Sequence, residues 1–363
     1  MIPIMRPQLP PLERYVALLR RVWDSRMLSN FGPLAREFEA GAQRYLGNPD
    51  VRAIVSGDIG LITAIAALDI PEGSEAIVPS FTFNSTVNAI AWNGLVPVFA
   101  DIDPRSFNAD AADVASRVTS RTKLILATHV FGNPADADAL KAAARGIPVI
   151  YDAAHSYGSR YRGRASGGGT LGAFEVFSFS GTKLVTSAEG GLVAAANAEL
   201  ARKIEYLRAY GFQGDYESHM VGINGKLSEL NAALGVLTLE MAEDAVARRQ
   251  VIVARYRERL AGIEGIGFQH VDGRDRSTWK DFAILLRDGT TRDRVEAALS
   301  AEEIQTKRYF RPAHAMRAYR RWTSGPLPVT EDVYARILCI PIFNELPDAD
   351  IDRIADVVRR AAS

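Results

Sequence analysis

From Val51 to about residue 209, short and continuous apolar runs alternate with segments that can form helices. The runs that we expect to be buried strands are 51–55, 75–79, 96–100, 123–128, 147–151, 174–179 and 192–196. Helices fit at about 59–68, 85–93, 109–117, 136–145 and 199–209. Continuous apolar strands that alternate with helices predict an α/β fold with a mostly parallel sheet covered on both faces. In such sheets, ligands bind beyond the carboxyl ends of the strands.

Two helices precede this pattern, at 12–24 and about 34–46, and a different pattern follows it. Near residue 226 the alternation of strands and helices ends, and one long helical stretch, straight or bent, is expected at about 227–262. Strands are then expected near 266–271, 279–286 and 303–309, and helices near 292–300, 329–336 and 348–361. The sequence therefore predicts a large α/β domain at 1–240, with an N-terminal helical segment, and a smaller C-terminal α+β domain at 241–363.

The charge balance and the cysteine count narrow the classes of function. Lys plus Arg number 43 and Asp plus Glu number 43, so the net charge is zero, which argues against a general nucleic-acid-binding protein. A local basic pocket for a small phosphate-bearing molecule remains compatible with this balance. Cys339 is the only cysteine, so no intrachain disulfide can form, which fits a reducing cytosol. The N-terminus lacks a signal-peptide pattern and no apolar run reaches about 18 residues, so we expect a cytoplasmic protein without a membrane partner.

A single lysine follows the sixth expected strand. The apolar run ends near Phe179, and three small residues, Ser180, Gly181 and Thr182, lead to Lys183. A lysine held there has room beside it, and desolvation would lower the pKa of its ammonium, which frees the amine to attack an aldehyde. Taken alone, however, the stretch fits a solvated lysine on a loop between strands better than a cofactor-binding lysine.

A possible anion site follows the first expected strand. The segment from Ser56 to Gly60 opens a helix, so its backbone amides can approach an anion at the helix N-terminus. A plain helix start capped by Ser56 explains the same residues. The segment is not Gly-x-Gly-x-x-Gly, so the dinucleotide-binding fingerprint is absent.

Acidic and aromatic residues follow two other strands. Asp152 ends the fifth strand, where a carboxylate lies at the ligand-binding edge, and the two alanines after it leave space. A structural Asp152 that caps a turn and a structural His155 are the simpler interpretations of these residues alone. Phe81 and Phe83 follow the second strand; one suits the core, and the other suits a face on which a flat ring stacks.

Motifs for metals and for nucleoside triphosphates are weak. The five histidines are scattered, with no His-x-x-x-His and no Cys-x-x-Cys, so no metal site is expected. The Gly-Thr-Lys triplet at 181–183 lacks the upstream glycine of a phosphate-binding loop, which argues against a nucleoside triphosphatase.

Taken together, several segments resemble the DegT/DnrJ-type sugar aminotransferases, which are pyridoxal 5'-phosphate (PLP) enzymes of the aspartate aminotransferase fold, fold type I. The likeness covers nearly the whole chain. Each segment is a weak motif, but their order and spacing together are specific. The segments are 30–33, 55–57, 77–83, 97–103, 129–132, 152–155, 178–191, 222–224 and 228–233.

The resemblance implies roles for the residues around the cofactor ring. It implies that Lys183 forms an imine with PLP and exchanges protons during the reaction. Asp152 corresponds to the acid that pairs with the pyridine nitrogen and keeps it protonated, which makes the ring an electron sink. His155 corresponds to the residue near the phenolic oxygen of the ring, and Phe83 to the aromatic residue that stacks on it.

Other residues correspond to phosphate ligands of the family. The backbone amides that follow Gly57, those of Asp58 and Ile59, match phosphate-binding groups, and Ser178 matches another. Asn224 matches an asparagine that reaches the phosphate in the partner subunit, which implies a homodimer with shared sites. The chain departs from the family at Asp58, where threonine is usual. A carboxylate beside a phosphate is repulsive, so we expect the Asp58 side chain to cap the helix or to turn toward another group.

The segment 308–314 resembles one found in members that act at C4 of dTDP-4-keto-6-deoxyhexoses, with one arginine where tyrosine is usual. Arg308, Tyr309 and His314 are therefore candidate ligands of a nucleotide sugar, because arginine suits bidentate contact with a diphosphate. Lys226 is a second candidate for the diphosphate. A strand end with solvated arginines explains the segment equally well.

The resemblance implies transfer of the amino group of L-glutamate to a nucleotide-linked keto-deoxysugar, with dTDP-4-keto-6-deoxyglucose at C4 as the preferred substrate. The alternatives are a 3-keto-sugar aminotransferase of the same family, a PLP-dependent sugar dehydratase and a catalytically silent PLP-binding protein. Lys183 favours transamination, because the deoxygenating members of the family lack this lysine or carry a histidine in its place. A nicotinamide-dependent sugar dehydrogenase suits the strand–helix pattern, but its glycine fingerprint is missing. The sequence leaves the keto-sugar, its nucleotide and the pathway open.

Overall fold

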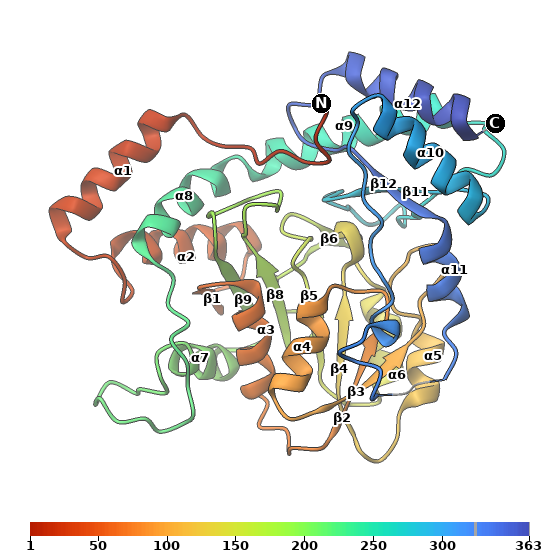
Figure 1. Ribbon diagram of the computed structural model, residues 1–363. Coiled ribbons are helices and arrows are strands. Elements are labelled where there is room, and N and C mark those ends of the chain that lie inside the picture. The colour runs from red at the N-terminus through yellow and green to blue at the C-terminus, as the bar shows by residue number, and fades with distance from the viewer. Residues whose placement is uncertain (323–324, 363) are drawn as a thin grey trace.

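The computed structural model describes residues 1–322 and 325–362, and its centre is a seven-stranded sheet (Figure 1). The strand order is β1-β9-β8-β5-β4-β2-β3, and neighbours are parallel except in the pairs that include β9. The strands are β1 (Val51–Ile54), β2 (Glu75–Pro79), β3 (Val96–Ala100), β4 (Thr122–Thr128), β5 (Val149–Asp152), β8 (Phe174–Ser178) and β9 (Gly191–Ala195). The predicted mostly parallel sheet is confirmed.

Helices cover both faces of this sheet. One face carries α3 (Gly57–Ala66), α4 (Asn84–Trp92) and α7 (Ala198–Leu207), and the other carries α2 (Pro33–Leu46), α5 (Ala111–Arg117) and α6 (Ala137–Ala144). Successive residues of a strand point to opposite faces. Val78 therefore joins the apolar cluster under α3 and α4, whereas its neighbour Ile77 joins the cluster under α5 and α6. Burial on both faces explains why the strands are apolar along their whole length.

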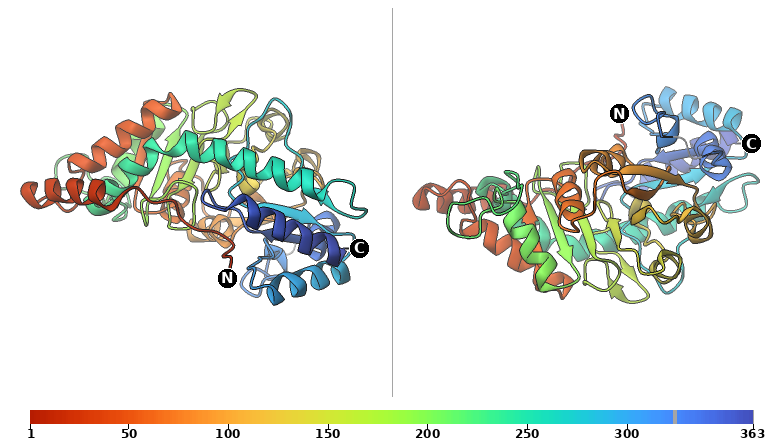
Figure 2. Two further views of the ribbon diagram at one scale, coloured as in Figure 1. Left: turned by 90° about the horizontal axis from the view of Figure 1, so that it is seen from above. Right: turned by 90° about the horizontal axis from the view of Figure 1, so that it is seen from below.

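The C-terminal part forms a separate apolar cluster around a small antiparallel sheet of order β10-β11-β12. Its elements are α9 (Ala242–Leu260), β10 (Gly267–Phe268), β11 (Phe282–Leu285), α10 (Gly289–Ala301), β12 (Ile337–Ile340) and α12 (Asp348–Ala362). Helix α8 (Glu229–Glu240) packs on α2 and shares its apolar cluster, and α11 (Pro328–Arg336) leads into β12. Helices α9 and α12 pack against each other beside this sheet (Figure 2). The division of the chain at residues 240 and 241 stays a prediction.

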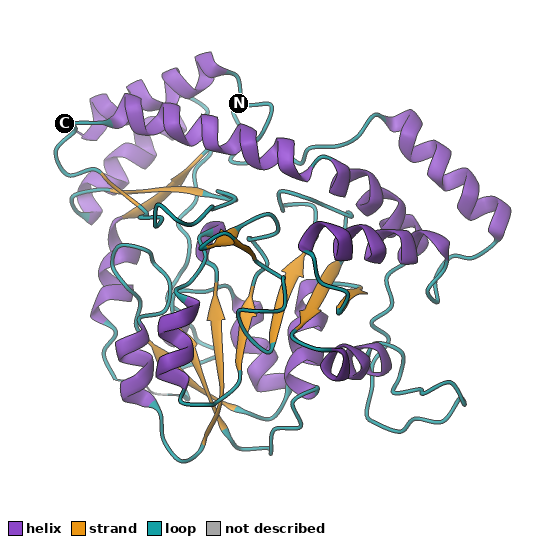
Figure 3. Ribbon diagram, turned by 180° about the vertical axis from the view of Figure 1, so that it is seen from behind, coloured by secondary structure: helices purple, strands orange, loops and turns teal. Residues whose placement is uncertain are grey.

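The remaining elements lie around the large sheet and the C-terminal part. Helix α1 (Leu12–Ser25) packs on α8 at the outer edge of the molecule (Figure 3), and β6 (Arg160–Tyr161) pairs with β7 (Arg164–Ala165) as a short hairpin. Single 3₁₀ turns lie at Val130–Gly132 and Ala313–Ala315. Within the described part of the chain, no helix combines the length and the apolar character that crossing a bilayer requires.

The structure decides one point that the sequence left open and overturns one expected element. The long helical stretch is bent, because α8 and α9 meet at Met241 instead of forming one helix. The strand expected at 303–309 is wrong. Lys307 exchanges backbone hydrogen bonds with Cys339 of β12, at 2.8 and 3.1 Å, but this is an isolated pair. The chain then leaves the edge of the small sheet, since Phe310 turns to pack against Phe81 and Phe131.

Buried Glu229 joins α8 to α2. Its carboxylate, on a residue that is 1% exposed, accepts hydrogen bonds from the backbone amides of Leu34 and Ala35, both at 2.8 Å. These amides belong to the first turn of α2, where no intrahelical acceptor exists and the helix dipole favours a negative charge. Gly32 makes room for the acid, because a Cβ there would lie 2.6 Å from Glu229 Cδ. Capping of helix α2 therefore explains why Glu229 is buried.

We expect Glu229→Ala to lower the free energy of unfolding by about 2 to 4 kcal/mol, because it leaves two buried amides unpaired. Denaturant titration at fixed protein concentration measures this change. Glu199→Ala, in the exposed first turn of α7, is the matched control and should change the free energy by less than about 0.5 kcal/mol. Equal losses for the two variants would contradict the capping role of Glu229.

Candidate active site

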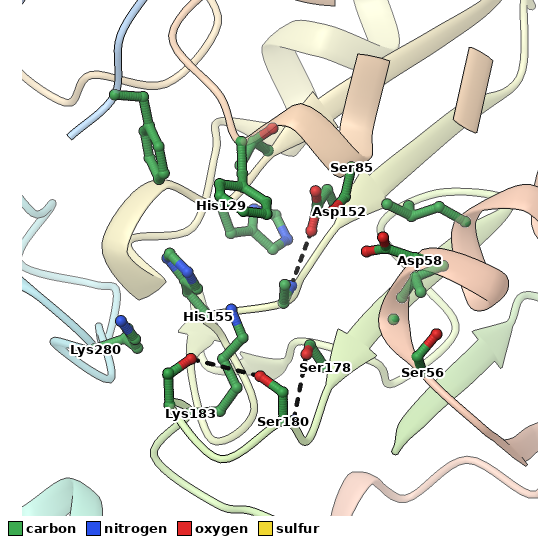
Figure 4. A pocket seen from close by; sticks show the side chains of 18 of the residues that line it. Ser56, Asp58, Ser85, His129, Asp152, His155, Ser178, Ser180, Lys183 and Lys280 are labelled. Atoms are coloured by element: carbon green, nitrogen blue, oxygen red, sulfur yellow. Dashed lines mark hydrogen bonds between the residues drawn. The ribbon is translucent and has the colours of Figure 1, made fainter. Parts of the chain in front are cut away.

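A cavity of about 470 Å³ opens at the carboxyl ends of the central strands, where ligands bind in folds of this type. Its walls come from the ends of β4, β5 and β8, the start of α3, the loop after β2 and two segments of the C-terminal part (Figure 4). The polar and aromatic side chains that line it are Ser56, Asp58, Phe83, Ser85, Thr128, His129, Asp152, His155, Ser178, Ser180, Thr182, Lys183, Glu189, Lys280, Lys307, Tyr309 and Phe310.

Lys183 lies on the turn that follows β8, and its side chain enters this cavity (Figure 4). Its backbone amide donates to the carbonyl of Ser180 at 3.0 Å, whereas its ammonium has no hydrogen-bond partner among the described residues. The pKa of Lys183 is lowered to about 8, because burial and the charge of Lys280 lower it more than the carboxylate of Asp152 raises it. An amine with this pKa is uncharged in about one molecule in ten at pH 7.

Asp152, the last residue of β5, is buried and faces the same cavity. Its carboxylate accepts a hydrogen bond from Thr86 Oγ1 at 2.6 Å and another from the amide of Ala154 at 3.1 Å. Burial raises the pKa of Asp152, and these two hydrogen bonds lower it. Thr86 is in turn linked to Thr82 at 2.7 Å, so the acid is held in one orientation.

His155 and two phenylalanines form the wall beside Lys183. Burial lowers the pKa of His155 well below its ordinary value, so the imidazole is neutral, and its Nδ1 is buried without a partner in the described structure. Phe310 lies 6.2 Å from its ring, at an interplanar angle of 25°. Phe83 lines the cavity and is 54% exposed, whereas Phe81 is fully buried, which matches the expected division between a core ring and an available face.

The start of α3 differs from the sequence expectation. Ser56 Oγ accepts a hydrogen bond from the amide of Ile59 at 3.2 Å, so Ser56 is the cap and the Ile59 amide is engaged. Asp58 therefore does not cap the helix; its carboxylate lines the cavity and makes no hydrogen bond to the described residues. The amides of Gly57 and Asp58 stay open. Gly57 also lies against β8, because a Cβ there would be 3.0 Å from Ser178 Cβ.

Besides Ile59, four residues proposed from the sequence lie outside this cavity, whereas Tyr309 lines it. Asn224 is exposed, and its Oδ1 accepts a hydrogen bond from Lys226 Nζ at 2.7 Å. Arg308 pairs with Asp293, at 2.8 Å, and with Glu296. His314 Nδ1 lies 2.6 Å from Ser80 Oγ, and its Nε2 lies 3.2 Å from Glu331.

Sequence reasoning missed three residues at the site. Thr86 carries no motif, and only the fold brings it to Asp152. Lys280 and Lys307 line the cavity from the C-terminal part of the chain. A signal for Lys280 existed, because Lys280 and Asp281 are two charges inside an otherwise apolar run, and such charges are buried only as a pair.

The lowered pKa of Lys183 can be measured on protein freed of small molecules. We expect labelling of Lys183 by an amine-reactive reagent to reach half of its maximal rate near pH 8, because the reagent attacks only the uncharged amine. Peptide mapping at a series of pH values follows the label. A free model lysine with a pKa of about 10.4 is the control. Coincident profiles for the two amines would show that burial does not act on Lys183.

The chain is similar to known proteins in sequence and in structure. The sequence profile of the DegT/DnrJ/EryC1/StrS aminotransferase family matches residues 12–359. The chain is 31% identical to the dTDP-4-amino-4,6-dideoxy-D-glucose transaminase of Escherichia coli over 98% of each protein. It is 34% identical to the GDP-perosamine synthase of Caulobacter vibrioides over 97% of this chain and 96% of that protein. A crystal structure of DesI in the presence of its TDP-sugar product matches with a TM-score of 0.91 and 38% identity, over 98% of this chain and 92% of that chain.

Proposed function

The chain belongs to the DegT/DnrJ/EryC1/StrS aminotransferase family, and we propose that it transfers the amino group of L-glutamate to C4 of a nucleotide-linked keto-deoxysugar, dTDP-4-keto-6-deoxyglucose. The similarity to the E. coli transaminase and to DesI, which was crystallised with a TDP-sugar, supports the dTDP-linked substrate. The similarity to a GDP-perosamine synthase makes a GDP-linked keto-sugar the second candidate. The observation that carries the proposal is the half-buried Lys183, whose amine has no partner among the described residues, in the same cavity as buried Asp152.

The cofactor is pyridoxal 5'-phosphate, and the cavity has the groups to hold it. The open amides at the start of α3, together with Ser178 Oγ, offer donors for a phosphate dianion. The partnerless amine of Lys183 is available to the aldehyde, and the partnerless Nδ1 of His155 is available to a polar group of the ring. Asp152, whose pKa burial raises, gains from a positive partner such as a protonated ring nitrogen.

In this proposal, PLP supplies an aldehyde that carries the amino group and a ring that accepts an electron pair. The Nζ of Lys183 takes the proton from Cα of the amino donor and later gives a proton to the sugar carbon that receives the amino group. A pKa of about 8 suits both roles, because the amine exists in both protonation states near neutral pH. The hydrogen bonds from Thr86 and from the amide of Ala154 hold the Asp152 carboxylate in the cavity, where it would pair with a protonated ring nitrogen.

We propose further that the chain works as a homodimer in which Asn224 reaches the phosphate in the cavity of the partner subunit. Asn224 is exposed and lies outside the cavity of its own subunit. The segment that precedes it exposes two large apolar side chains, with Val221 98% exposed and Tyr216 91% exposed. Large apolar side chains that project from one loop are typical of a protein–protein interface. A C2 dimer would bury both copies of this loop.

The reaction is tested with Lys183→Ala and a panel of substrates. We expect the PLP-loaded wild type to change its visible absorbance with L-glutamate and to recover it with dTDP-4-keto-6-deoxyglucose. A GDP-linked 4-keto-sugar and a 3-keto-sugar are the comparison arms. Lys183→Ala should lower the rate at least about a hundredfold, because it removes the proton-transfer group. Lys123→Ala, at an exposed position, is the matched control. Turnover by Lys183→Ala at the wild-type rate would overturn the assignment.

The shared site is tested by complementation. Lys183→Ala and Asn224→Ala should each be inactive alone. After mixing under conditions that exchange subunits, half of the dimers contain one chain of each variant. Each mixed dimer has one intact site out of two, so about a quarter of the wild-type activity should return. Kinetic assay of the mixture against each pure variant measures this recovery. No recovery, with subunit exchange confirmed by tagged chains, would place Asn224 in its own subunit's site or outside the chemistry.

A further inference from the structure

We propose that Lys280 and Lys307 form the subsite for a carboxylate of the amino donor. The inference rests on the proposed function, because it assumes that the amino donor is an α-amino acid. Such a donor carries a carboxylate on the same carbon as its amino group. When the amino group lies at Lys183, this carboxylate lies a few ångströms away, and it needs a positive partner there. The described cations of the cavity, apart from Lys183 itself, are Lys280 and Lys307.

Lys280 is a buried cation with donor capacity to spare. It is 5% exposed, and its Nζ lies 3.1 and 3.2 Å from the two carboxylate oxygens of Asp281, which is 3% exposed. An ammonium has three N–H groups, so two satisfy Asp281 and one remains for a ligand in the cavity. Asp281 also removes the cost of burying an isolated charge and fixes the direction of the lysine.

Lys307 adds a charge that no described acid neutralises. Its side chain is exposed at the cavity and takes part in no ion pair with a described residue. Its backbone is fixed by the two-way pair with Cys339. The ring of Tyr309 lies close to both ammonium groups, with its centroid 5.7 Å from Lys280 Nζ and 5.5 Å from Lys307 Nζ. Contact with the aromatic face holds the two cations on one wall.

This wall is separate from the part of the cavity that suits the cofactor phosphate. Figure 4 shows Lys280 on one side of Lys183, next to His155, and Ser56 and Asp58 on the other side. The charge of Lys280 lowers the pKa of both Lys183 and His155, which indicates that it lies near the reacting amine. The negative groups of the cavity surface are at Asp58, Asp152 and Glu189, so Lys280 and Lys307 provide the positive wall.

The cations expected from the sequence are not available for this role. Arg308 is held by Asp293 and Glu296, and Lys226 donates to Asn224 on the exposed loop. The keto-sugar has no carboxylate next to its reacting carbon. The positive wall should therefore matter in the half-reaction with the amino donor and not in the half-reaction with the sugar.

Measuring the half-reaction with the amino donor and the half-reaction with the keto-sugar separately shows which of the two substrates the positive wall binds. Lys307→Met is the first variant, because it breaks no ion pair, and Lys280→Met combined with Asp281→Asn is the second, because it leaves no unpaired buried charge. In rapid-mixing experiments followed by cofactor absorbance, we expect each variant to need about 10- to 100-fold more L-glutamate for half-saturation, as for a lost charge-assisted hydrogen bond. Half-saturation by the keto-sugar nucleotide should stay within about twofold. Lys123→Met is the matched control.

Binding of glutarate, which has two carboxylates and no amino group, gives a readout without turnover. Calorimetry should show that glutarate binds the wild type and Lys123→Met with equal affinity. Its affinity for Lys307→Met and for the Lys280→Met, Asp281→Asn double variant should be lower by a factor of about 10 or more. Lys307→Arg, which keeps the charge, should restore most of the affinity. Unchanged glutamate saturation and glutarate binding in both variants would overturn the subsite, as would a loss confined to the keto-sugar, which would assign the wall to a phosphoryl group. A wild type that binds glutarate but never reacts with glutamate would instead overturn the proposed donor.

Discussion

Under the proposed function, the chemistry of this protein depends on keeping one amine out of water in a fixed position. Burial is the largest cause of the lowered pKa of Lys183. The turn that carries it is pinned at both ends, because the amide of Phe179 donates to Gly190 and the carbonyl of Phe179 accepts from the amide of Ser187, each at 2.8 Å. Strand β8 lies between β5 and β9, so the turn begins from the middle of the sheet. A mobile loop would let water solvate the ammonium and restore its ordinary pKa.

Three buried acids of the chain show that position, not residue type, decides a role. Glu229 accepts from two amides of α2. Asp101, just after β3, accepts from the amides of Val329 and Thr330 at the start of α11, at 3.0 and 2.7 Å, and so joins the large sheet to the C-terminal part. Asp152 faces the cavity and accepts only one amide and one hydroxyl, so it keeps capacity for a positive ligand.

The charges of the cavity are arranged around Lys183. Under the proposed function, the phosphate binds near Asp58, whose carboxylate repels it, and the open amides and the dipole at the start of α3 offset this repulsion. The repulsion also disfavours a second anion at this end. The amino donor, which carries carboxylates, is then directed to the opposite wall. One cavity can thus bind two anionic groups in different places because each end has its own balance of charge.

The sequence by itself determined the order of the strands and helices of the large sheet, because continuous apolar runs that alternate with helices suit a sheet that is buried on both faces. It also located Lys183, Asp152 and the start of α3, since each lies at the end of a strand or in the turn after it, and chain connectivity fixes such neighbours. Only the tertiary structure decided which distant side chains join them. Lys280 enters the cavity, whereas Arg308, close to the cavity-lining Tyr309 in the chain, turns to Asp293 and Glu296. The reason is physical: partners that are about a hundred residues apart meet because the C-terminal part packs against the large sheet, and the local spacing of residues does not encode that packing.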